Sequence, residues 1–248
     1  GIGAAIAREL APKSSSLLLS ARRVDQIEAL AAELGADTVA ADLEHRDQVA
    51  ALAAASSNID IAVMNAALPA SGDLLDYDVD QIDRAIEVNL RAPLVLARLL
   101  GEQMAARGGG HIVFISSLAG KAASAGSCLY SATKFGLRGG AIAMRADWAD
   151  RNVGISVVCP GFVSDAGMFA DSGAHLPKGI KTVTPEQVAD GVVSAVEKNK
   201  LEVDVAPLPL KIGASLAVVA PAIWESLNRR TGGQKLSDKM SDSQKHKR

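Results

Sequence analysis

Three side chains suited to proton transfer fall within one short stretch of the chain. Tyr130 and Lys134 are four residues apart in Tyr-Ser-Ala-Thr-Lys, and Ser117 stands 13 residues before the tyrosine, at the end of an apolar run. If residues 127–151 form a helix, Tyr130 and Lys134 lie one turn apart on the same face. A nearby cation favours the phenolate of a tyrosine, whose pKa is ordinarily about 10. The stretch therefore predicts general acid/base chemistry.

The Tyr-x-x-x-Lys pattern is weak by itself, because any long helix can carry a surface tyrosine beside a solvated lysine. Three further motifs make the pattern specific: Gly-Ile-Gly at residues 1–3, Asn65 in Met-Asn-Ala-Ala, and Asn89 in Val-Asn-Leu-Arg-Ala-Pro. With these motifs in this order, the chain resembles the short-chain dehydrogenase/reductases over nearly its whole length.

The resemblance implies a role for each of the candidate catalytic residues. Ser117 would hydrogen-bond the substrate oxygen, and Tyr130 would protonate or deprotonate it. Lys134 would bind the nicotinamide ribose and lower the pKa of Tyr130, while Asn89 would hold a water of the proton relay. The expected activity is an NADP(H)-dependent transfer of hydride between nicotinamide and a carbonyl or secondary alcohol.

Apolar runs of strand length alternate with helical patterns along the chain. The expected strands are 16–20, 38–41, 59–64, 111–116, 154–159 and 201–206, and the expected helices are 1–11, 24–34, 46–56, 79–107, 127–151, 184–198 and 212–230. Continuous apolar strands are typical of a parallel sheet that is covered on both faces. The sequence predicts one α/β domain over residues 1–230, a three-layer doubly wound parallel sheet of Rossmann type, followed by a flexible polar tail at 231–248.

The cofactor motif begins abruptly. Gly1, Ile2 and Gly3 open a helix and resemble the second half of the family's glycine-rich turn, so we expect the first strand and the first glycine to lie upstream. Glycines there let the backbone approach a pyrophosphate at a helix N-terminus. Without the first strand, the neighbouring strands expose their hydrogen-bonding edges, and the 248-residue chain is expected to fold poorly.

The choice between NAD and NADP is set after the second strand of such folds, where an acidic residue accepts the ribose hydroxyls of NAD. Here the sequence is Ser-Ala-Arg-Arg at residues 20–23. Arg22 can hold a 2′-phosphate, and no carboxylate stands there to repel it. We therefore expect NADP(H) to be preferred over NAD(H). The alternative is a pair of solvated arginines at a helix start.

Two further motifs resemble adenine- and ribose-binding elements of the family. Asp42 and Leu43 follow the third strand, where the family contacts adenine, although Asp42 can also be a simple helix N-cap. Asn65 matches the second Asn of the family's Asn-Asn-Ala-Gly element. Met64 and Ala67 depart from that element, and the alanine methyl narrows the site.

A Pro-Gly turn after the sixth strand of the family's sheet resembles the segment that meets the nicotinamide. It comprises Pro160, Gly161 and Val163 as cofactor-binding residues. Where the family usually carries a threonine, this chain has Asp165, which cannot donate to the nicotinamide carbonyl when ionised. Ser164 can take its place.

Composition narrows the remaining possibilities. A net charge of −2 gives no broad electrostatic reason to bind nucleic acid or an anionic surface. Cys128 and Cys159 show no metal or redox spacing, which indicates free thiols in a reducing compartment, and we expect a cytoplasmic protein without a metal site.

Substrate choice is expected in residues 162–183 and in the last helix. Apolar residues in that loop (Met168, Phe169, Leu176 and Ile180) suggest a partly apolar substrate, or they anchor the loop to the body. Residues 212–224 carry no charge but are too short to span a membrane. We expect a terminal core helix that is kinked or ended at Pro221; the alternatives are a lid over the substrate or an interfacial anchor.

Two other functions remain open. Sugar-nucleotide epimerases and dehydratases reuse Tyr-x-x-x-Lys, but they usually add a C-terminal substrate domain, and only two helices and a strand are expected after Pro160. A cofactor-binding regulatory or scaffold protein can keep the fold without turnover. By resemblance, helices 79–107 and 127–151 would pair in a homodimer or homotetramer.

Overall fold

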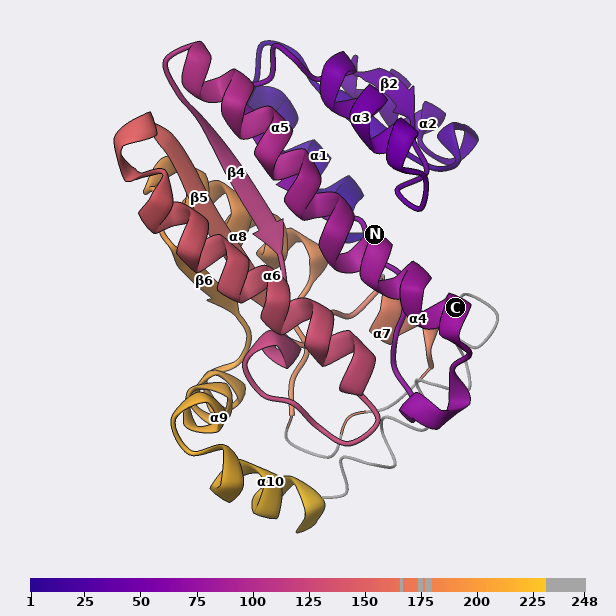
Figure 1. Ribbon diagram of the computed structural model, residues 1–248, viewed down its shortest axis with the longest axis vertical. Helices are drawn as coiled ribbons and strands as arrows, with labels where there is room; N and C mark the ends of the chain where they lie inside the picture. Colours follow the sequence, from indigo (N-terminus) through magenta and orange to yellow (C-terminus); the bar gives the residue numbers. More distant parts are fainter. Residues whose placement is uncertain (166, 174–175, 177–179, 231–248) are drawn as a thin grey trace.

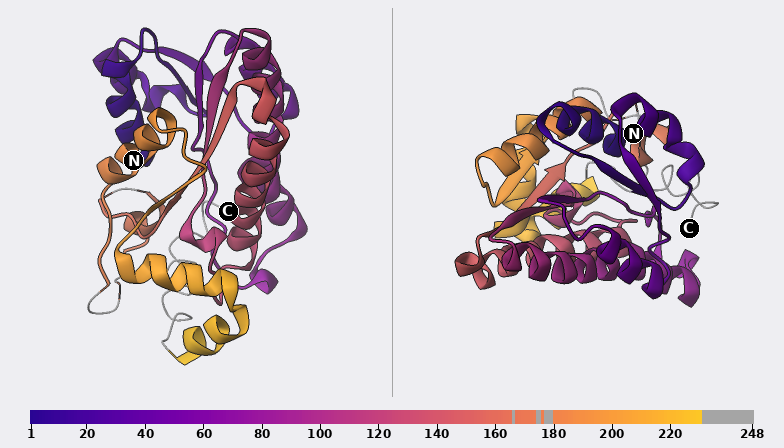
Figure 2. Two further views of the ribbon diagram at one scale, coloured as in Figure 1. Left: turned by 90° about the vertical axis from the view of Figure 1, so that its left-hand side faces the viewer. Right: turned by 90° about the horizontal axis from the view of Figure 1, so that it is seen from above.

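The computed structural model describes residues 1–165, 167–173, 176 and 180–230. The tail expected at 231–248 lies outside these residues. The described part forms three layers, with parallel strands in the middle and helices on both faces (Figures 1 and 2). This is the doubly wound Rossmann-like arrangement that the alternation of strands and helices predicts.

All six expected strands are present, and every pairing is parallel. They are β1 (Leu18–Ala21), β2 (Asp37–Ala40), β3 (Ile61–Met64), β4 (Gly110–Ile115), β5 (Val153–Pro160) and β6 (Glu202–Val205). The continuous apolar run of the central strand β4 follows from burial on both faces. Ile112 and Phe114 enter the core on one face of the sheet, and Val113 and Ile115 enter the core on the other. A strand that is buried on both faces has no polar alternation.

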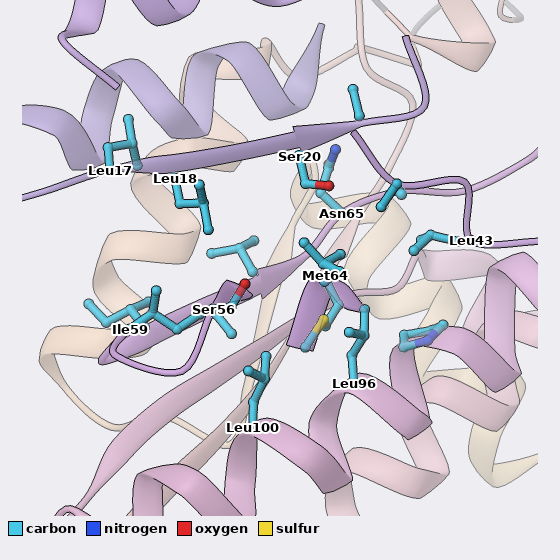
Figure 3. Close-up of a pocket in the computed structure, with 18 of the residues that line it drawn as sticks. Leu17, Leu18, Ser20, Leu43, Ser56, Ile59, Met64, Asn65, Leu96 and Leu100 are labelled. Atoms are coloured by element: carbon cyan, nitrogen blue, oxygen red, sulfur yellow. The ribbon is translucent and has the colours of Figure 1, made fainter. Parts of the chain in front are cut away.

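The sheet is divided between β1 and β3. Strands β1 and β2 pair with each other, β3 to β6 form a second sheet, and no ladder joins β1 to β3. A cavity of about 590 Å³ lies between their facing edges. Figure 3 shows this cavity between the segment of Leu17, Leu18 and Ser20 and the end of β3 at Met64, above Leu96 and Leu100 of helix α5 (Ala92–Ala106). The expected upstream strand stays a prediction, and this gap is the place where it would pair.

The helices separate into two layers. On one face α1 (Ile2–Leu10) packs against α8 (Pro185–Glu197) and α2 (Glu28–Leu34). On the other lie α3 (Arg46–Ala55), α4 (Val79–Ile86), α5 (Ala92–Ala106) and α6 (Cys128–Asp147) (Figure 2). The helix expected at 79–107 is present, but a π-helical turn, Glu87–Arg91, joins α4 to α5. Such turns recur at functional sites, and this one contains Asn89.

The C-terminal segment differs from the expected single core helix. Two helices are present, α9 (Leu208–Val219) and α10 (Pro221–Arg230), so the first begins four residues earlier than predicted, and Pro221 opens the second. They project beyond the ends of the strands rather than packing in the core (Figures 1 and 2). The apolar composition alone could not distinguish a buried helix from an exposed one.

Candidate active site

A cleft of about 1570 Å³ runs along the carboxyl ends of the strands, where doubly wound folds bind their ligands. Its walls are the start of α1, the end of β1, the loops after β3, β4 and β5, and parts of α6, α9 and α10. It brings together most of the residues predicted from the sequence: Gly1, Ile2, Gly3, Arg22, Asn65, Ser117, Tyr130, Lys134, Pro160, Gly161 and Val163.

The three candidate catalytic side chains meet at one end of this cleft. Ser117 follows β4, and its side chain lies near Tyr130 on the first turns of α6, where it acts to lower the pKa of the phenol. The Ser117 hydroxyl also accepts from the Ala119 N–H at 3.1 Å. Lys134, one turn after the tyrosine, is 3% exposed, and its Nζ lies 5.7 Å from the centroid of the phenol ring. The i, i+4 spacing therefore places phenol and ammonium on one face, as predicted.

Close packing fixes the turn that carries Ser117. The 3₁₀ turn Leu118–Gly120 lies directly against α6, and a Cβ on Gly120 would come within 2.7 Å of the Lys134 carbonyl oxygen. Ser116 Oγ donates to the same carbonyl at 2.9 Å. Strand β4 and helix α6 are thus held together at the point where Ser117 faces Tyr130.

The pKa of Tyr130 differs from the expectation. Burial raises the pKa of the phenol above its ordinary value, and the hydrogen bond with Ser117 acts in the opposite direction without overcoming it. The Lys134 Nζ lies 5.7 Å from the centroid of the phenol ring and donates to the Ile115 carbonyl at 3.0 Å, and its expected effect on the pKa of Tyr130 stays a prediction. Burial therefore favours the protonated form of the Tyr130 phenol.

Lys134 is affected by the same burial. Removing its ammonium from water lowers the pKa of Lys134 to about 8, with a smaller opposing effect from Cys159. The thiol itself is not reactive, since burial raises the pKa of Cys159 to about 12. Lys134 thus loses its charge only slightly above neutral pH.

Asn89 is fully buried in the π-helical turn, away from the cleft lining. Its Oδ1 accepts from the Leu68 N–H at 2.6 Å, and its Nδ2 donates to the Leu68 carbonyl at 2.9 Å. Asn89 therefore holds the loop that follows β3. Its role with a relay water stays a prediction.

The start of α1 forms the opposite end of the cleft. The first N–H groups of a helix have no partner within it, so residues 2–4 present donors and the positive end of the helix dipole. A Cβ at Gly3 would stand 2.8 Å from Nδ2 of Asn65. A side chain at position 3 would require the Asn65 amide to shift, and a close approach of this kind is the geometry that a pyrophosphate-binding turn needs.

Arg22, at the end of β1, lies between two carboxylates. Its guanidinium is 3.9 Å from Asp42 and 3.8 Å from Glu44, distances too long for hydrogen bonds. The Arg22 side chain is 55% exposed and lines the cleft, and neither carboxylate makes a close ion pair with it. A phosphate at this position would compete with both carboxylates. The contact of Arg22 with Glu44 could not be predicted from the sequence, because it depends on the fold after β2.

Asp42 and Leu43 lie in the neighbouring cavity between the sheets rather than in the main cleft. The Asp42 side chain accepts a hydrogen bond from the Glu44 N–H at 3.1 Å, two residues further along, as in an Asx turn. The N-cap residue of α3 is His45. The alternative of Asp42 as the helix N-cap is therefore wrong. Arg22 and Asn65 line both cavities, so the two spaces meet at the gap in the sheet.

The turn after β5 lines the cleft with Pro160, Gly161 and Val163, which the sequence predicts to contact the nicotinamide. Gly161 donates its N–H to the Val205 carbonyl at 2.9 Å, and Val163 bridges to Val183. Asp165 has a positive φ of 63°, and its carboxylate accepts from Ser164 Oγ at 2.7 Å. Ser164 was expected to take the place of the threonine that the family carries at position 165. Its hydroxyl instead donates to Asp165, the residue at that position.

Sequence reasoning missed Lys121, just after the Ser117 turn. It is 5% exposed and binds Asp204 at 2.6 Å as well as Glu202, both on β6. Burial opposes the charge, but the hydrogen bonds to Asp204 and Glu202 prevail and raise the pKa of Lys121. The ion pairs tie the Ser117 loop to β6. Its partners lie about 80 residues away, so no local pattern could indicate them.

Among the described residues, no group of three or more metal-ligating side chains gathers, and no helix is long and apolar enough to cross a membrane.

Comparison with known proteins agrees with this geometry. The family model described as short chain dehydrogenase matches residues 1–176, and the chain belongs to that family. It is 32% identical to the ketoacyl reductase HetN of Nostoc over 98% of this chain and 90% of that protein. A metagenomic short-chain oxidoreductase solved in complex with NADP is 33% identical, covers 84% of this chain and 92% of its own, and superposes with a TM-score of 0.68.

A third likeness concerns the fold alone. A short-chain dehydrogenase from Sphingobium yanoikuyae in complex with NADPH is 24% identical, with a TM-score of 0.76 over 90% of this chain and 89% of its own. Family and fold together define an NAD(P)-dependent oxidoreductase that acts on CH–OH and C=O groups of small molecules.

Proposed function

We propose that this protein is an NADP(H)-dependent carbonyl reductase in which Tyr130 is the general acid. The observation that carries the proposal is the meeting of Ser117, Tyr130 and Lys134 at one end of a cleft whose other end is the start of α1. When bound, the nicotinamide cofactor supplies the hydride. The residues of the chain bind the cofactor, orient the substrate and protonate its oxygen.

The proton steps follow from the positions of the side chains. Ser117 is placed to donate to the substrate oxygen, and Tyr130, kept neutral by burial, donates its proton to that oxygen as negative charge develops there. The Lys134 cation stands over the phenol ring and stabilises the phenolate that remains. A protonated tyrosine favours reduction as the working direction near neutral pH.

The cofactor end fits a phosphorylated dinucleotide. Residues 1–3 and Asn65 would receive the pyrophosphate, and Pro160, Gly161 and Val163 would contact the nicotinamide. Arg22 would bind the 2′-phosphate, since its two carboxylate neighbours stand beyond hydrogen-bonding distance. Asp42 and Leu43 would border the adenine. NADP(H) is therefore preferred over NAD(H) in this proposal.

The substrate is proposed to be a partly apolar carbonyl compound. Apolar side chains of the loop after β5 and of the last two helices line the cleft beyond Tyr130 (Met168, Phe169, Leu176, Ile180, Leu210 and Trp224). A curated relative is a ketoacyl reductase, which makes ketoacyl thioesters a first class to test. We also propose that the long helices pair in a homodimer or homotetramer, which a solution mass measurement tests.

Cofactor choice is tested by NADPH and NADH oxidation with a panel of ketones, aldehydes and ketoacyl thioesters. Arg22→Leu is expected to lower kcat/KM for NADPH by about tenfold or more and to leave NADH unaffected, because it removes a charge-assisted contact. Arg23→Leu is the matched control, since Arg23 is exposed but does not line the cleft. NADPH binding without reduction of any compound would favour a regulatory protein instead.

A further inference from the structure

The ion pairs of Lys121 belong to a network that reaches helix α6. Glu202, which binds Lys121, also binds Arg138 through its other carboxylate oxygen, and Arg138 lies on α6. Lys121 directly follows the 3₁₀ turn of Ser117, while Glu202 lies on β6. The network therefore joins three elements: the turn that carries Ser117, the strand β6 and the helix that carries Tyr130.

The network lies on the face of the sheet that α6 covers. Glu202 pairs with Val157 in the register of β5 and β6, and Asp204 pairs with Cys159. Paired residues of neighbouring strands point to the same face. Val157 and Cys159 enter the core to which α6 contributes, so both carboxylates project toward α6. Their side chains are only 24% and 20% exposed, which withdraws the ion pairs largely from water.

The charges of the network balance. Lys121 and Arg138 are the two cations, and Glu202 and Asp204 are the two anions. Burial opposes the charge of Glu202, but hydrogen bonds from Arg138 and Lys121 prevail and lower its pKa. Replacing a buried ion pair as a whole by uncharged side chains costs little stability, because the desolvation penalty disappears with it. The directional contacts of the network fix how the joined elements lie, and this effect is more specific than its contribution to stability.

The turn between Lys121 and Ser117 is short and closed by hydrogen bonds. The Gly120 N–H donates to the Ser117 carbonyl at 2.9 Å, and the Lys121 N–H donates to the Leu118 carbonyl at 2.9 Å. A turn closed in this way moves as a unit, so a shift of Lys121 also displaces Ser117. The position of the Ser117 hydroxyl therefore depends on where the ion pairs hold Lys121.

We propose that Lys121 is a positioning residue of the active site: through its ion pairs it holds Ser117 at the distance from Tyr130 that proton transfer requires. Lys121 does not line the cleft and acts only through the Ser117 turn. The proposal rests on the proposed carbonyl reduction, in which Ser117 and Tyr130 act on the same substrate oxygen. A misplacement of about 1 Å in such a site costs up to about 10²-fold in rate.

The test compares two double variants that leave the net charge unchanged. Lys121→Met with Asp204→Asn removes one cation and one anion and leaves the second ion pair of the network in place. This variant should lower kcat for carbonyl reduction by about tenfold to 10²-fold, with the Kd for NADPH unchanged. Arg98→Met with Glu102→Gln is the matched control, because it removes an exposed ion pair of α5 that lines neither cavity. The control should keep both values.

A double-mutant cycle with Ser117→Ala shows whether Lys121 acts through Ser117. In the Ser117→Ala background, Lys121→Met with Asp204→Asn should lower kcat no further, because the hydroxyl that the network positions is already absent. If the double variant does not fold, Asp204→Asn alone, which keeps the shape of the side chain, should still lower kcat while NADPH binding is retained. Urea unfolding of every variant separates these effects from losses of stability.

The positioning role is overturned if the unchanged chain reduces carbonyls and both double variants do so equally well. It is also overturned if the loss of kcat is the same with and without the Ser117 hydroxyl. A lower free energy of unfolding with unchanged kcat would assign the ion pairs of Lys121 to the fold alone. No carbonyl reduction by the unchanged chain would overturn the proposed function, and the positioning role with it.

Discussion

Burial favours the protonated form of Tyr130. Burial raises the pKa of the phenol, and Lys134, itself buried, does not reverse the effect. An acid that holds its proton at neutral pH and gives it up as the substrate oxygen gains charge suits carbonyl reduction. The candidate catalytic residues could be predicted from the sequence, but their ionisation depends on burial, which the sequence alone does not show.

Lys134 should set the alkaline limit of activity. Burial lowers the pKa of Lys134 from its ordinary value to about 8, so the cation is present below that pH and lost above it. We predict that kcat/KM for NADPH, which reports ionisations of the free enzyme, falls as the pH rises through about 8. Lys134→Arg keeps its charge at all these pH values and should move the fall upward. Identical pH profiles for both proteins would contradict this role.

At the scale of the element, the first turn of α1 lies close to Asn65 in the loop after β3. Gly3→Ala places a methyl group 2.8 Å from Nδ2 of Asn65, and we predict that NADPH binding weakens at least about tenfold, measured by fluorescence titration. Gly139→Ala on α6 is the control, because no heavy atom lies within 4 Å of the added Cβ. Both changes raise helix propensity alike. Equal NADPH affinities would show that the contact is not needed.

The division of the sheet between β1 and β3 leads to a second prediction at this scale. Among the residues that the structure describes, the facing edges of β1 and β3 have no strand partner across the cavity of Figure 3, and one parallel strand would hydrogen-bond both. A chain extended ahead of Gly1 by an apolar strand and a glycine turn should gain several kcal/mol in its free energy of unfolding in urea. The same extension with alternating prolines cannot donate hydrogen bonds and should gain much less.

Local elements could be predicted from the sequence where one pattern determines them. The six strands follow from short apolar runs, and the capping box at Thr184 with Pro185 places the start of α8. Contacts between distant segments could not be predicted. The ion pairs of Lys121 with β6, the Asn89 contact with Leu68 and the exposure of α9 all depend on how elements pack together.

At the scale of the whole molecule, the burial of His111 leads to a prediction of how the free energy of unfolding depends on pH. Burial, and then Arg145, lower the pKa of His111 from 6.5 to about 4. Between about pH 6.5 and 4, the unfolded chain therefore takes up a proton at His111 that the folded chain does not. The contribution of the neutral His111 to the free energy of unfolding is complete above about pH 6.5 and is lost as the pH falls toward 4. The loss is about 3 kcal/mol.

Urea unfolding at about pH 7.5 and about pH 4.5 measures this contribution. His111→Asn should show a smaller difference between the two conditions than the unchanged chain, even if its stability is lower at both. His111 Nε2 lies 2.8 Å from Ser156 Oγ, so the comparison must use the difference rather than the absolute values. The same pH dependence in both proteins would assign the loss to other groups.

The most direct measurement of the central claim is carbonyl reduction by Tyr130→Phe, with NADPH binding measured on the same protein. The chain contains one other tyrosine, Tyr77, so Tyr77→Phe is the matched control. We predict that Tyr130→Phe binds NADPH as the unchanged chain does but reduces carbonyls about 10²- to 10⁴-fold more slowly, because only the proton donor is lost. Turnover by Tyr130→Phe equal to that of Tyr77→Phe would contradict the assignment of Tyr130 as the acid.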